Sequence, residues 1–404
     1  MTEALPDPMT LPVQRGCPFD PPAVYGRLRT ERPISRLRLP GGRIGWLVTR
    51  YQDARATLAD PKFTPPLMQI APVEEFAFNE EEIAELEIPP GTFSALDPPE
   101  QTRYRRLVAQ HFTVKHMREL TPRIEQIVTE LLDDIERGGP PADLVSGFAL
   151  PIPGRVISEL LGVPVEQRDE FQRQTSAMLS WVSDGTDIRE ARETIYKSLG
   201  ELVAAKRRAP GQDVLSGLVH ADNSLTDEEV VNMGVLLLIA GLETTANMLG
   251  LGAFALLENP DQLATLRAQP ELMDQAVEEL LRYLTIVQFG LTRTAREDTV
   301  VAGQPIAAGE TVIVSLAAGN RDAEVFAEPD RLDITQRREQ HLAFGHGVHQ
   351  CLGAQLARVE MRIGFRALFQ RFPTLRLAVP AAEVSLGEDM VFYGAHSLPV
   401  TWDV

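Results

Sequence analysis

The sequence has 404 residues, 44% of them hydrophobic and 24% charged, which is ordinary for a globular protein and argues against a disordered chain. Its formal net charge of −18 argues against nucleic acid as a partner, because duplex binding needs a basic surface that displaces counterions. Two cysteines leave no disulfide framework and indicate a reducing compartment. No basic segment followed by an apolar run opens the chain, so we expect a soluble, cytoplasmic protein.

The first 60 residues predict two helices around a hairpin. Helical patterns cover 21–32 and 51–60. Between them, 34–39 and 44–50 alternate in polarity around a glycine pair, which is typical of a β-hairpin.

The next segment, 61–97, is irregular and rich in proline, with an acidic run from 79 to 87. Long segments of this kind are often lids or substrate loops. The acidic run itself is expected to be a solvated face. Only the apolar members are expected to face a ligand: Met68, Phe76 and Phe93.

The middle of the chain, 98–208, is predicted to be a bundle of amphipathic helices. Interruptions are expected at Pro122, 138–141, 151–153 and 163–164, where proline and glycine break the pattern.

A long apolar helix is predicted over 226–258, opened by a cap at Thr226. Its stretch 235–257 is long enough to span a membrane. Glu243 and two threonines at its centre argue against exposure to lipid. We therefore expect a core helix and no membrane association.

The last third of the chain alternates short helices with strand-like runs. The predicted helices are 261–268, 272–284 and 352–369, and the predicted strands are 299–301, 311–315, 374–379 and 400–402.

Cys351 ends a loop punctuated by glycine, Phe344-Gly-His-Gly-Val-His-Gln-Cys, and a predicted helix follows it directly. A thiol at a helix start is biased toward thiolate, which is a nucleophile and a metal ligand. As an axial ligand of haem iron, a thiolate favours O–O cleavage. Two alternatives are an inert buried cysteine and a zinc site with His346 and His349. Zinc is disfavoured because no second ligand cluster follows.

The spacing Phe-Gly-x-Gly-x-His-x-Cys-x-Gly resembles the haem-binding loop of the cytochrome P450 superfamily, and the order of elements resembles that fold over 1–404. The resemblance implies one domain, mainly α with small β-sheets. It implies haem b, iron protoporphyrin IX, as cofactor and Cys351 as the iron ligand. Residues of the same loop would contact the haem: Phe344, Gly345, His349 and Gly353.

The centre of the long helix reads Ala240-Gly241-Leu242-Glu243-Thr244-Thr245. An acid and a hydroxyl in a buried apolar helix need partners. The small Ala240 and Gly241 would let another group approach, and Thr244 could divert a backbone carbonyl and open the helix locally. By resemblance, Thr244 and Glu243 assist oxygen activation and proton delivery. The alternative is a threonine bonded within its own helix beside a glutamate at a polar junction.

Glu279 and Arg282 lie three residues apart on one predicted helical face. By resemblance this pair is buried and holds the Cys loop through a third basic residue. The position expected for that residue is Gln336, which departs from the family pattern. Three arginines were alternatives for the missing charge: Arg321, Arg331 and Arg337.

The two haem carboxylates would need charge-assisted donors. By resemblance these are His349, Arg293, Arg105 and Gln101. Gln101 departs from the usual histidine and keeps a donor without a positive charge, which predicts weaker anchoring there.

The substrate pocket is expected to be apolar. Met233, Leu237 and Ala240 share one face of the long helix. The other pocket residues implied by the resemblance are Phe93, Val287, Phe289, Met390, Val391 and Phe392. Core packing is the alternative for each of them.

Electrons must come from another protein, because no Gly-rich flavin or nicotinamide motif follows a strand. The resemblance implies a ferredoxin and a ferredoxin reductase. A basic patch would complement an acidic ferredoxin: Arg103, Arg106, Arg337, Arg338, Arg358 and Arg362. A solvated surface is the alternative.

The sequence is similar to actinobacterial class I members. This implies a monomeric monooxygenase that inserts one atom of O2 into a hydrophobic small molecule. Macrolides, terpenoids, steroid-like natural products and xenobiotics are the candidate substrates, and hydroxylation is the expected reaction. The alternatives are a haem-thiolate enzyme that uses peroxide or reduces a small oxidant, and a haem sensor or carrier without turnover.

Overall fold

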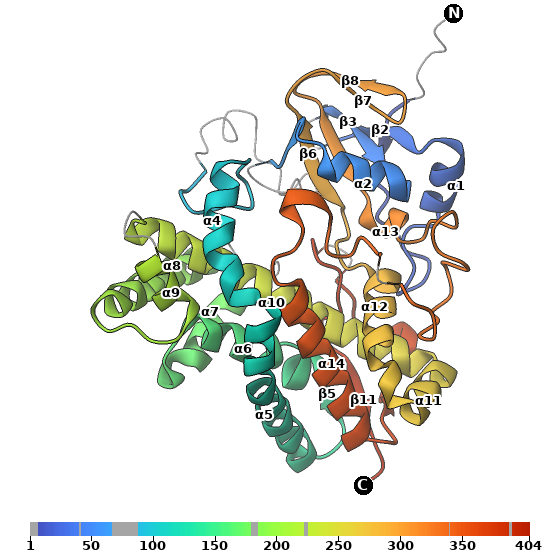
Figure 1. Cartoon of the computed structure of the whole chain (residues 1–404). Helices are drawn as coiled ribbons and strands as arrows, with labels where there is room; N and C mark the ends of the chain where they lie inside the picture. The colour runs from blue at the N-terminus through green and yellow to red at the C-terminus, as the bar shows by residue number, and fades with distance from the viewer. Residues whose placement is uncertain are drawn as a thin grey trace, which may run out of the picture.

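The computed structural model describes residues 7–39, 42–66, 88–178, 185–221, 225–338, 340–387 and 390–404. A β-rich part at the top of Figure 1 carries α1 and α2, and a larger helical part lies below it. The long helix α10 crosses the middle of the molecule. The expected fold class, mainly helical with small sheets, is confirmed.

The largest sheet has six strands in the order β1-β2-β3-β9-β6-β4. The predicted hairpin is confirmed, because β2 and β3 pair antiparallel. The strands are β1 (Met9–Thr10), β2 (Ile34–Arg38), β3 (Ile44–Val48), β9 (Thr311–Val314), β6 (Leu291–Ala295) and β4 (Phe63–Thr64). The central strands β3 and β9 pair in parallel, and Leu47, Val312 and Val314 there are almost completely buried. Helices α1 (Val24–Glu31) and α2 (Tyr51–Ala59) flank this sheet.

Two smaller sheets complete the β structure. One joins β10 (Arg376–Leu377), β11 (Pro399–Thr401) and β5 (Ala142–Asp143). The other is the hairpin of β7 (Thr299–Val301) and β8 (Gln304–Ile306). The strand predicted at 374–379 is thus only two residues long.

The helical part begins with α4 (Glu100–Ala109) and the long α5 (Val114–Gly138). The predicted interruption at Pro122 is wrong, because α5 continues through it. Residues Ile124, Val128 and Leu131 bury an apolar stripe on the same helix. Burial of this stripe against α6 and α14 compensates for the hydrogen bond that proline removes. Four helices follow: α6 (Pro151–Leu161), α7 (Arg168–Met178), α8 (Gly185–Arg208) and α9 (Val214–Ala221).

Helix α10 (Asp227–Glu258) forms the core of the helical part and contacts α6, α8, α12 and α14. Thr226 and Glu229 form a reciprocal capping box, which fixes its start. Among the described helices it alone has the length and apolar character of a membrane span, but 72% of its apolar window is buried inside the protein. This burial is that of a core helix.

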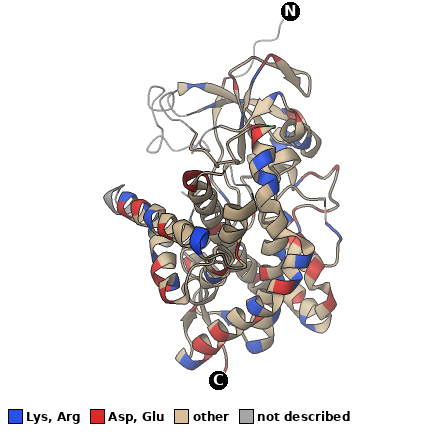
Figure 2. Ribbon diagram, turned by 60° about the vertical axis from the view of Figure 1, so that its left-hand side comes forward, with Lys and Arg blue, Asp and Glu red and all other residues tan. Residues whose placement is uncertain are grey.

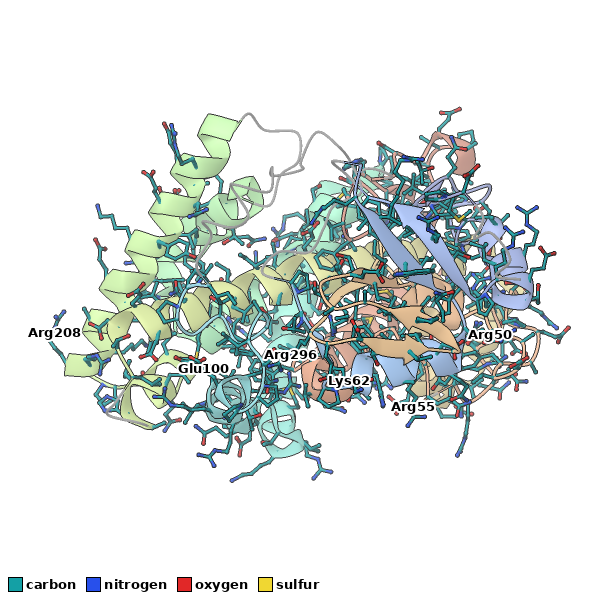
Figure 3. All side chains as sticks on the ribbon, turned by 90° about the horizontal axis from the view of Figure 1, so that it is seen from above. Arg50, Arg55, Lys62, Glu100, Arg208 and Arg296 are labelled. Carbon is teal, nitrogen blue, oxygen red and sulfur yellow. The ribbon has the colours of Figure 1, made fainter. Side chains whose placement is uncertain are left out.

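The remaining helices are α11 (Pro260–Ala268), α12 (Met273–Leu284), α13 (Leu316–Gly319) and α14 (Ala354–Arg371). Viewed from above, Figure 3 places Arg50 and Arg55 in the β-rich part and Arg208 at the opposite, helical end. Lys62 and Arg296 lie together where β4 meets β6, joined by a backbone hydrogen bond of 2.8 Å.

Candidate functional site

The Cys loop, residues 342–351, lies between α2 and α14. The Cys351 N–H donates to the Phe344 carbonyl at 2.8 Å, and a short 3₁₀ turn spans Gly347–His349. Gly347 has a φ of 77°, and a Cβ atom there would lie 2.6 Å from the Leu58 carbonyl oxygen of α2. Only glycine fits this close approach, so the glycine spacing docks the loop on α2.

The Cys351 side chain has exposed surface, yet its surroundings desolvate the sulfur. Burial raises the pKa of the thiol, and the Gly353 N–H, Arg105 and Arg358 oppose that rise. The helix start favours thiolate through the Gly353 N–H, as predicted, but desolvation is the larger effect on the thiol alone. Coordination to a metal ion deprotonates a thiol outright, so the site remains suited to a metal ligand.

The zinc alternative finds no support in the structure. His346 accepts a hydrogen bond from Arg55 Nε at 3.2 Å and points toward α2. Within the described ranges, no three His, Cys, Asp or Glu side chains come together.

Three basic side chains from separate elements converge near the Cys loop. Arg105 on α4 donates to the Gln350 carbonyl at 2.5 Å. Arg293 on β6 is buried, and burial lowers its pKa to about 10. Burial, followed by the nearby Arg293 charge, lowers the pKa of His349 to about 4.

One half-buried acid, Asp97, acts electrostatically on Arg293 and His349, but its ion pair is with Arg296. In the part of the chain that the structure describes, no carboxylate lies within ion-pair distance of Arg293. The Nε2 atom of His349 is buried and has no hydrogen-bond partner there. Burying a cation, or a ring nitrogen without a hydrogen-bond partner, costs free energy unless a bound anion pairs with it. The residues present therefore fit the two carboxylates of haem.

Gln101 bonds to the Cys loop. Its side chain is buried, and Nε2 donates to the Val348 carbonyl at 2.8 Å. Its Oε1 accepts from the Thr102 hydroxyl. The Gln101 amide thus holds α4 against the Cys loop. The sequence of α4 does not indicate this contact, because Val348 lies 247 residues away along the chain.

The centre of α10 combines a buried acid with an open face. Glu243 is buried, its Oε1 has no hydrogen-bond partner among the described residues, and desolvation raises its pKa to about 7. Thr244 donates to the Ala240 carbonyl at 2.8 Å, as expected, but α10 stays a continuous α-helix, so the predicted local opening is absent. Ala240 is exposed although its helix is largely buried.

Gly241 has a packing reason of its own. A Cβ atom at this position would lie 3.2 Å from the Ile157 side chain of α6. The absence of a side chain at Gly241 therefore lets α6 pack closely on α10. Of the two small residues, only Ala240 is exposed.

The predicted substrate residues divide into three groups. Met233, Leu237 and Phe93 are buried in the main helical core. Phe289 and Val391 pack with the apolar cluster of the β-rich part instead. Val287 and Phe392 meet in an isolated β-bridge, both half-buried, and Met390 is half-buried beside them. Met68 and Phe76 lie outside the described residues.

A residue that the sequence did not indicate holds the Phe392 turn against α10. Asn247, one turn after Glu243, donates from Nδ2 to the Phe392 carbonyl at 2.9 Å. A Cβ atom at Gly394 would meet its amide oxygen. The sequence feature that could have indicated this contact is a polar residue, Asn247, in an apolar helix one turn after Glu243.

The Glu279–Arg282 pair is fully buried and doubly hydrogen-bonded, at 2.7 and 2.8 Å. Its third member is Arg338, whose Nε lies 3.6 Å from Glu279 Oε2. None of the three proposed alternatives is correct. Arg321 pairs with Asp20 and Asp330, Arg331 is exposed and accepts through its carbonyl, and Arg337 is exposed.

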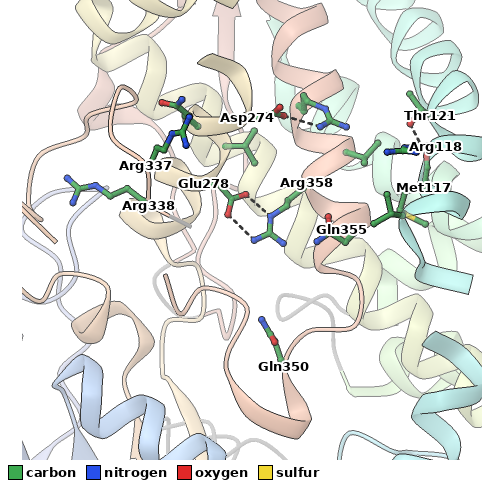
Figure 4. A pocket seen from close by; sticks show the side chains of 15 residues that line it. Met117, Arg118, Thr121, Asp274, Glu278, Arg337, Arg338, Gln350, Gln355 and Arg358 are labelled. Carbon is green, nitrogen blue, oxygen red and sulfur yellow. Dashed lines mark hydrogen bonds and ion pairs between the residues drawn. The ribbon is translucent and has the colours of Figure 1, made fainter. Parts of the chain in front are cut away.

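A groove of about 670 Å³ lies beside the Cys loop, between α5, α12 and α14. Figure 4 shows Gln350 at its edge and Arg358 inside it. Four of the predicted patch arginines are paired: Arg103 with Glu229, Arg338 with Glu279, Arg358 with Glu278 and Arg362 with Asp274. Arg337 and Arg118 also line the groove and are exposed.

Comparisons with known proteins agree with this geometry. The profile of the family described as Cytochrome P450 matches residues 175–377. Cytochrome P450 105C1 from a Streptomyces species is 49% identical, with all of both chains covered. Pentalenic acid synthase from Streptomyces avermitilis is 44% identical over 98% of each chain. The crystal structure of CYP105P1 in complex with filipin I has a TM-score of 0.91 and 44% identity, and covers 98% of this chain and 99% of that one. The chain therefore belongs to the cytochrome P450 family.

Proposed function

We propose that this protein is a cytoplasmic, single-domain haem-thiolate monooxygenase, monomeric, in which Cys351 binds the iron. The observation that carries this proposal is the convergence of the Cys351 loop with Arg105, Arg293 and His349, three basic side chains that the half-buried Asp97 opposes only in part. A haem would supply both the metal for the thiol and the carboxylates for the basic cluster.

The haem supplies, when bound, an iron whose thiolate ligand donates electron density and favours cleavage of the O–O bond. Cys351 would hold it from the side of α14, and Arg105, Arg293 and His349 would hold its carboxylates. Gln101 keeps the Cys loop against α4 through Val348. Phe344, Gly345 and Gly353 belong to the same loop and are proposed as further contacts.

Glu243 is proposed as the proton carrier. With a pKa raised to about 7 by burial, its carboxyl can both hold and release a proton at neutral pH. Thr244 follows it on α10, with a half-buried hydroxyl and an open neighbour at Ala240. The pair would hold and pass protons at the open face of this helix.

The substrate is proposed to be a hydrophobic natural product, hydroxylated by one atom of O2. Two observations support this. Leu237, one turn before Ala240 on α10, and Phe392, whose carbonyl bonds Asn247 of the same helix, are apolar. Relatives of the chain bear the names Pentalenic acid synthase and Nocardicin C N-oxygenase, and CYP105P1 has been crystallised with filipin I.

A ferredoxin, reduced by its reductase, is the proposed electron donor. The exposed arginines beside the Cys loop, Arg118 and Arg337 with Arg106 on α4, would meet an acidic partner. Exposed Val114 at the groove and Val348 in the Cys loop add apolar surface to this face.

The experiment is a screen of macrolides, terpenoids and steroids for a low- to high-spin shift of the haem. Each compound that shifts is then incubated with ferredoxin, reductase and O2, or with peroxide alone. We expect one added oxygen atom with the ferredoxin system. Product with peroxide only would favour the peroxide-using alternative, and a spin shift without product in either system would favour a sensor or carrier.

A further inference from the structure

Glu278, the neighbour of the buried clamp residue Glu279, forms a second charged centre on α12. Its two carboxylate oxygens accept from Arg358 of α14, at 2.6 and 2.8 Å. Its Oε2 also lies 3.1 Å from His341 Nε2. Burial alone would raise the pKa of Glu278, but the hydrogen bonds from Arg358 and His341 outweigh it and hold the pKa at about 2.

Both partners of Glu278 contact the Cys loop. His341 Nδ1 accepts from the Ala343 N–H at 3.1 Å, so its Nε2 carries the hydrogen and donates to Glu278. The Arg358 guanidinium lies 4.6 Å from the centre of the Phe344 ring. The Phe344 carbonyl in turn accepts from the Cys351 N–H. Two paths therefore run from Glu278 to the loop that presents the sulfur.

The same pair of helices offers a matched comparison. Asp274 and Arg362 lie one turn away from Glu278 and Arg358 on α12 and α14 and form an ion pair of 2.9 Å (Figure 4). Both side chains are more exposed than Glu278 and Arg358, and among the described residues neither has a hydrogen bond or ring contact to the Cys loop. This second bridge joins the helices without touching the loop.

We propose that Glu278, His341 and Arg358 form a second clamp, which positions the Cys351 loop and sets the charge around its sulfur. The Glu279–Arg282–Arg338 clamp bonds the chain at 320–333 and at 338, before the loop begins. The second clamp acts on the loop itself, at Ala343 through His341 and at Phe344 through Arg358. The inference rests on the proposed ligation by Cys351.

The charges in this clamp predict effects of opposite sign. Arg358 places a positive charge against the Cys loop, 4.6 Å from the centre of the Phe344 ring. Removing its positive charge should make reduction of a bound iron harder and lower the potential. Neutralising Glu278 leaves Arg358 uncompensated and should raise the potential. If the clamp only held the loop in place, the two variants would shift the potential in the same direction.

The test compares Glu278→Gln and Arg358→Gln with Asp274→Asn and Arg362→Gln, all as holoprotein. The readouts are the potential of the iron and the rate at which the red-shifted Soret band of the reduced carbon monoxide complex converts to a shorter-wavelength band. Losing a charged hydrogen bond should speed this conversion about tenfold in both clamp variants. The two controls should match the parent.

Arg358→Lys keeps the positive charge but loses the paired hydrogen bonds, so it should speed the conversion and leave the potential close to that of the parent. If a clamp variant fails to bind haem, His341→Leu removes the other partner of Glu278, leaves the Glu278–Arg358 ion pair in place and should still speed the conversion. Clamp variants that behave like the controls overturn the inference. A parent protein without the red-shifted band would instead overturn the proposed ligation by Cys351.

Discussion

At the scale of single residues, burial decides what Glu243 can do. The carboxyl lies in an apolar helix, and its pKa of about 7 stands far above the ordinary value of 4.5 because no described side chain compensates its charge. The protonated form therefore predominates below pH 7 and is lost as the pH rises through 7. A proton donor of this kind loses its function on the alkaline side.

Replacing Glu243 by Gln tests this role. We expect turnover to fall by about 10²- to 10⁴-fold, the usual contribution of a positioned acid or base. The fall in rate near pH 7 should disappear, since the variant has no carboxyl to titrate. Glu258→Gln, exposed at the end of the same helix, is the matched control and should keep the parent profile. A Glu243→Gln protein with the parent rate and pH profile would remove Glu243 from the mechanism.

The sequence predicted individual residues well where the signal was local. Cys351 and its glycines stand within ten positions, and the turn of Gly347 against α2 explains their spacing. The clamp residue Arg338 and the bond from Gln101 to Val348 were not predicted, because Glu279 and Val348 lie far from them along the chain. Contacts between residues far apart along the chain therefore could not be predicted from the local sequence.

At the scale of elements, long periodic segments were predictable and short ones were not. The bounds of α10 and α12 agree with the sequence to within a residue or two, because both follow a clear helical pattern and a capping box fixes the start of α10. Strands β4 and β5 have two residues each and exist through pairing with distant strands, so no local pattern marks them. Pro122 shows the reverse error, a local signal overruled by tertiary packing.

The buried clamp between α12 and the following segment offers a second prediction. Arg338→Met removes the ion pair with Glu279 and the hydrogen bond to the Ala327 carbonyl at 2.7 Å. We expect the free energy of unfolding to fall by about 1.5–3 kcal/mol, the contribution of a hydrogen bond to a charged group. The measurement is urea unfolding of the holoprotein.

Arg337→Met is the control for this change, because the adjacent side chain is exposed. Its free energy of unfolding should stay within about 0.5 kcal/mol of the parent. Equal losses in the two variants would contradict the assignment of Arg338 as the third clamp residue.

At the scale of the whole molecule, a net charge of −18 coexists with a local basic surface beside the Cys loop. Figure 2 shows both signs of charge interspersed along the helices. Many of the arginines near the groove are neutralised by acids, so the surface available to an acidic partner is smaller than the sequence alone predicted. Its exposed members are Arg106, Arg118 and Arg337.

Replacing Arg118 and Arg337 together by Gln should slow reduction by ferredoxin several-fold at low salt and weaken its dependence on ionic strength. Reduction by dithionite should be unchanged, because a small reductant needs no docking surface. The measurement is stopped-flow reduction of the haem. A matched double variant, Arg27→Gln with Arg32→Gln in the β-rich part, should behave like the parent. Equal slowing with both reductants would contradict docking at this face.

The central claim is that the sulfur of Cys351 binds the haem iron, and one spectrum tests it most directly. The purified holoprotein is reduced and exposed to carbon monoxide, beside a Cys351→His variant that offers a neutral nitrogen ligand instead. The account predicts the red-shifted Soret band of thiolate ligation in the parent and its loss in the variant. A parent spectrum without that band, or one that Cys351→His leaves unchanged, would contradict it.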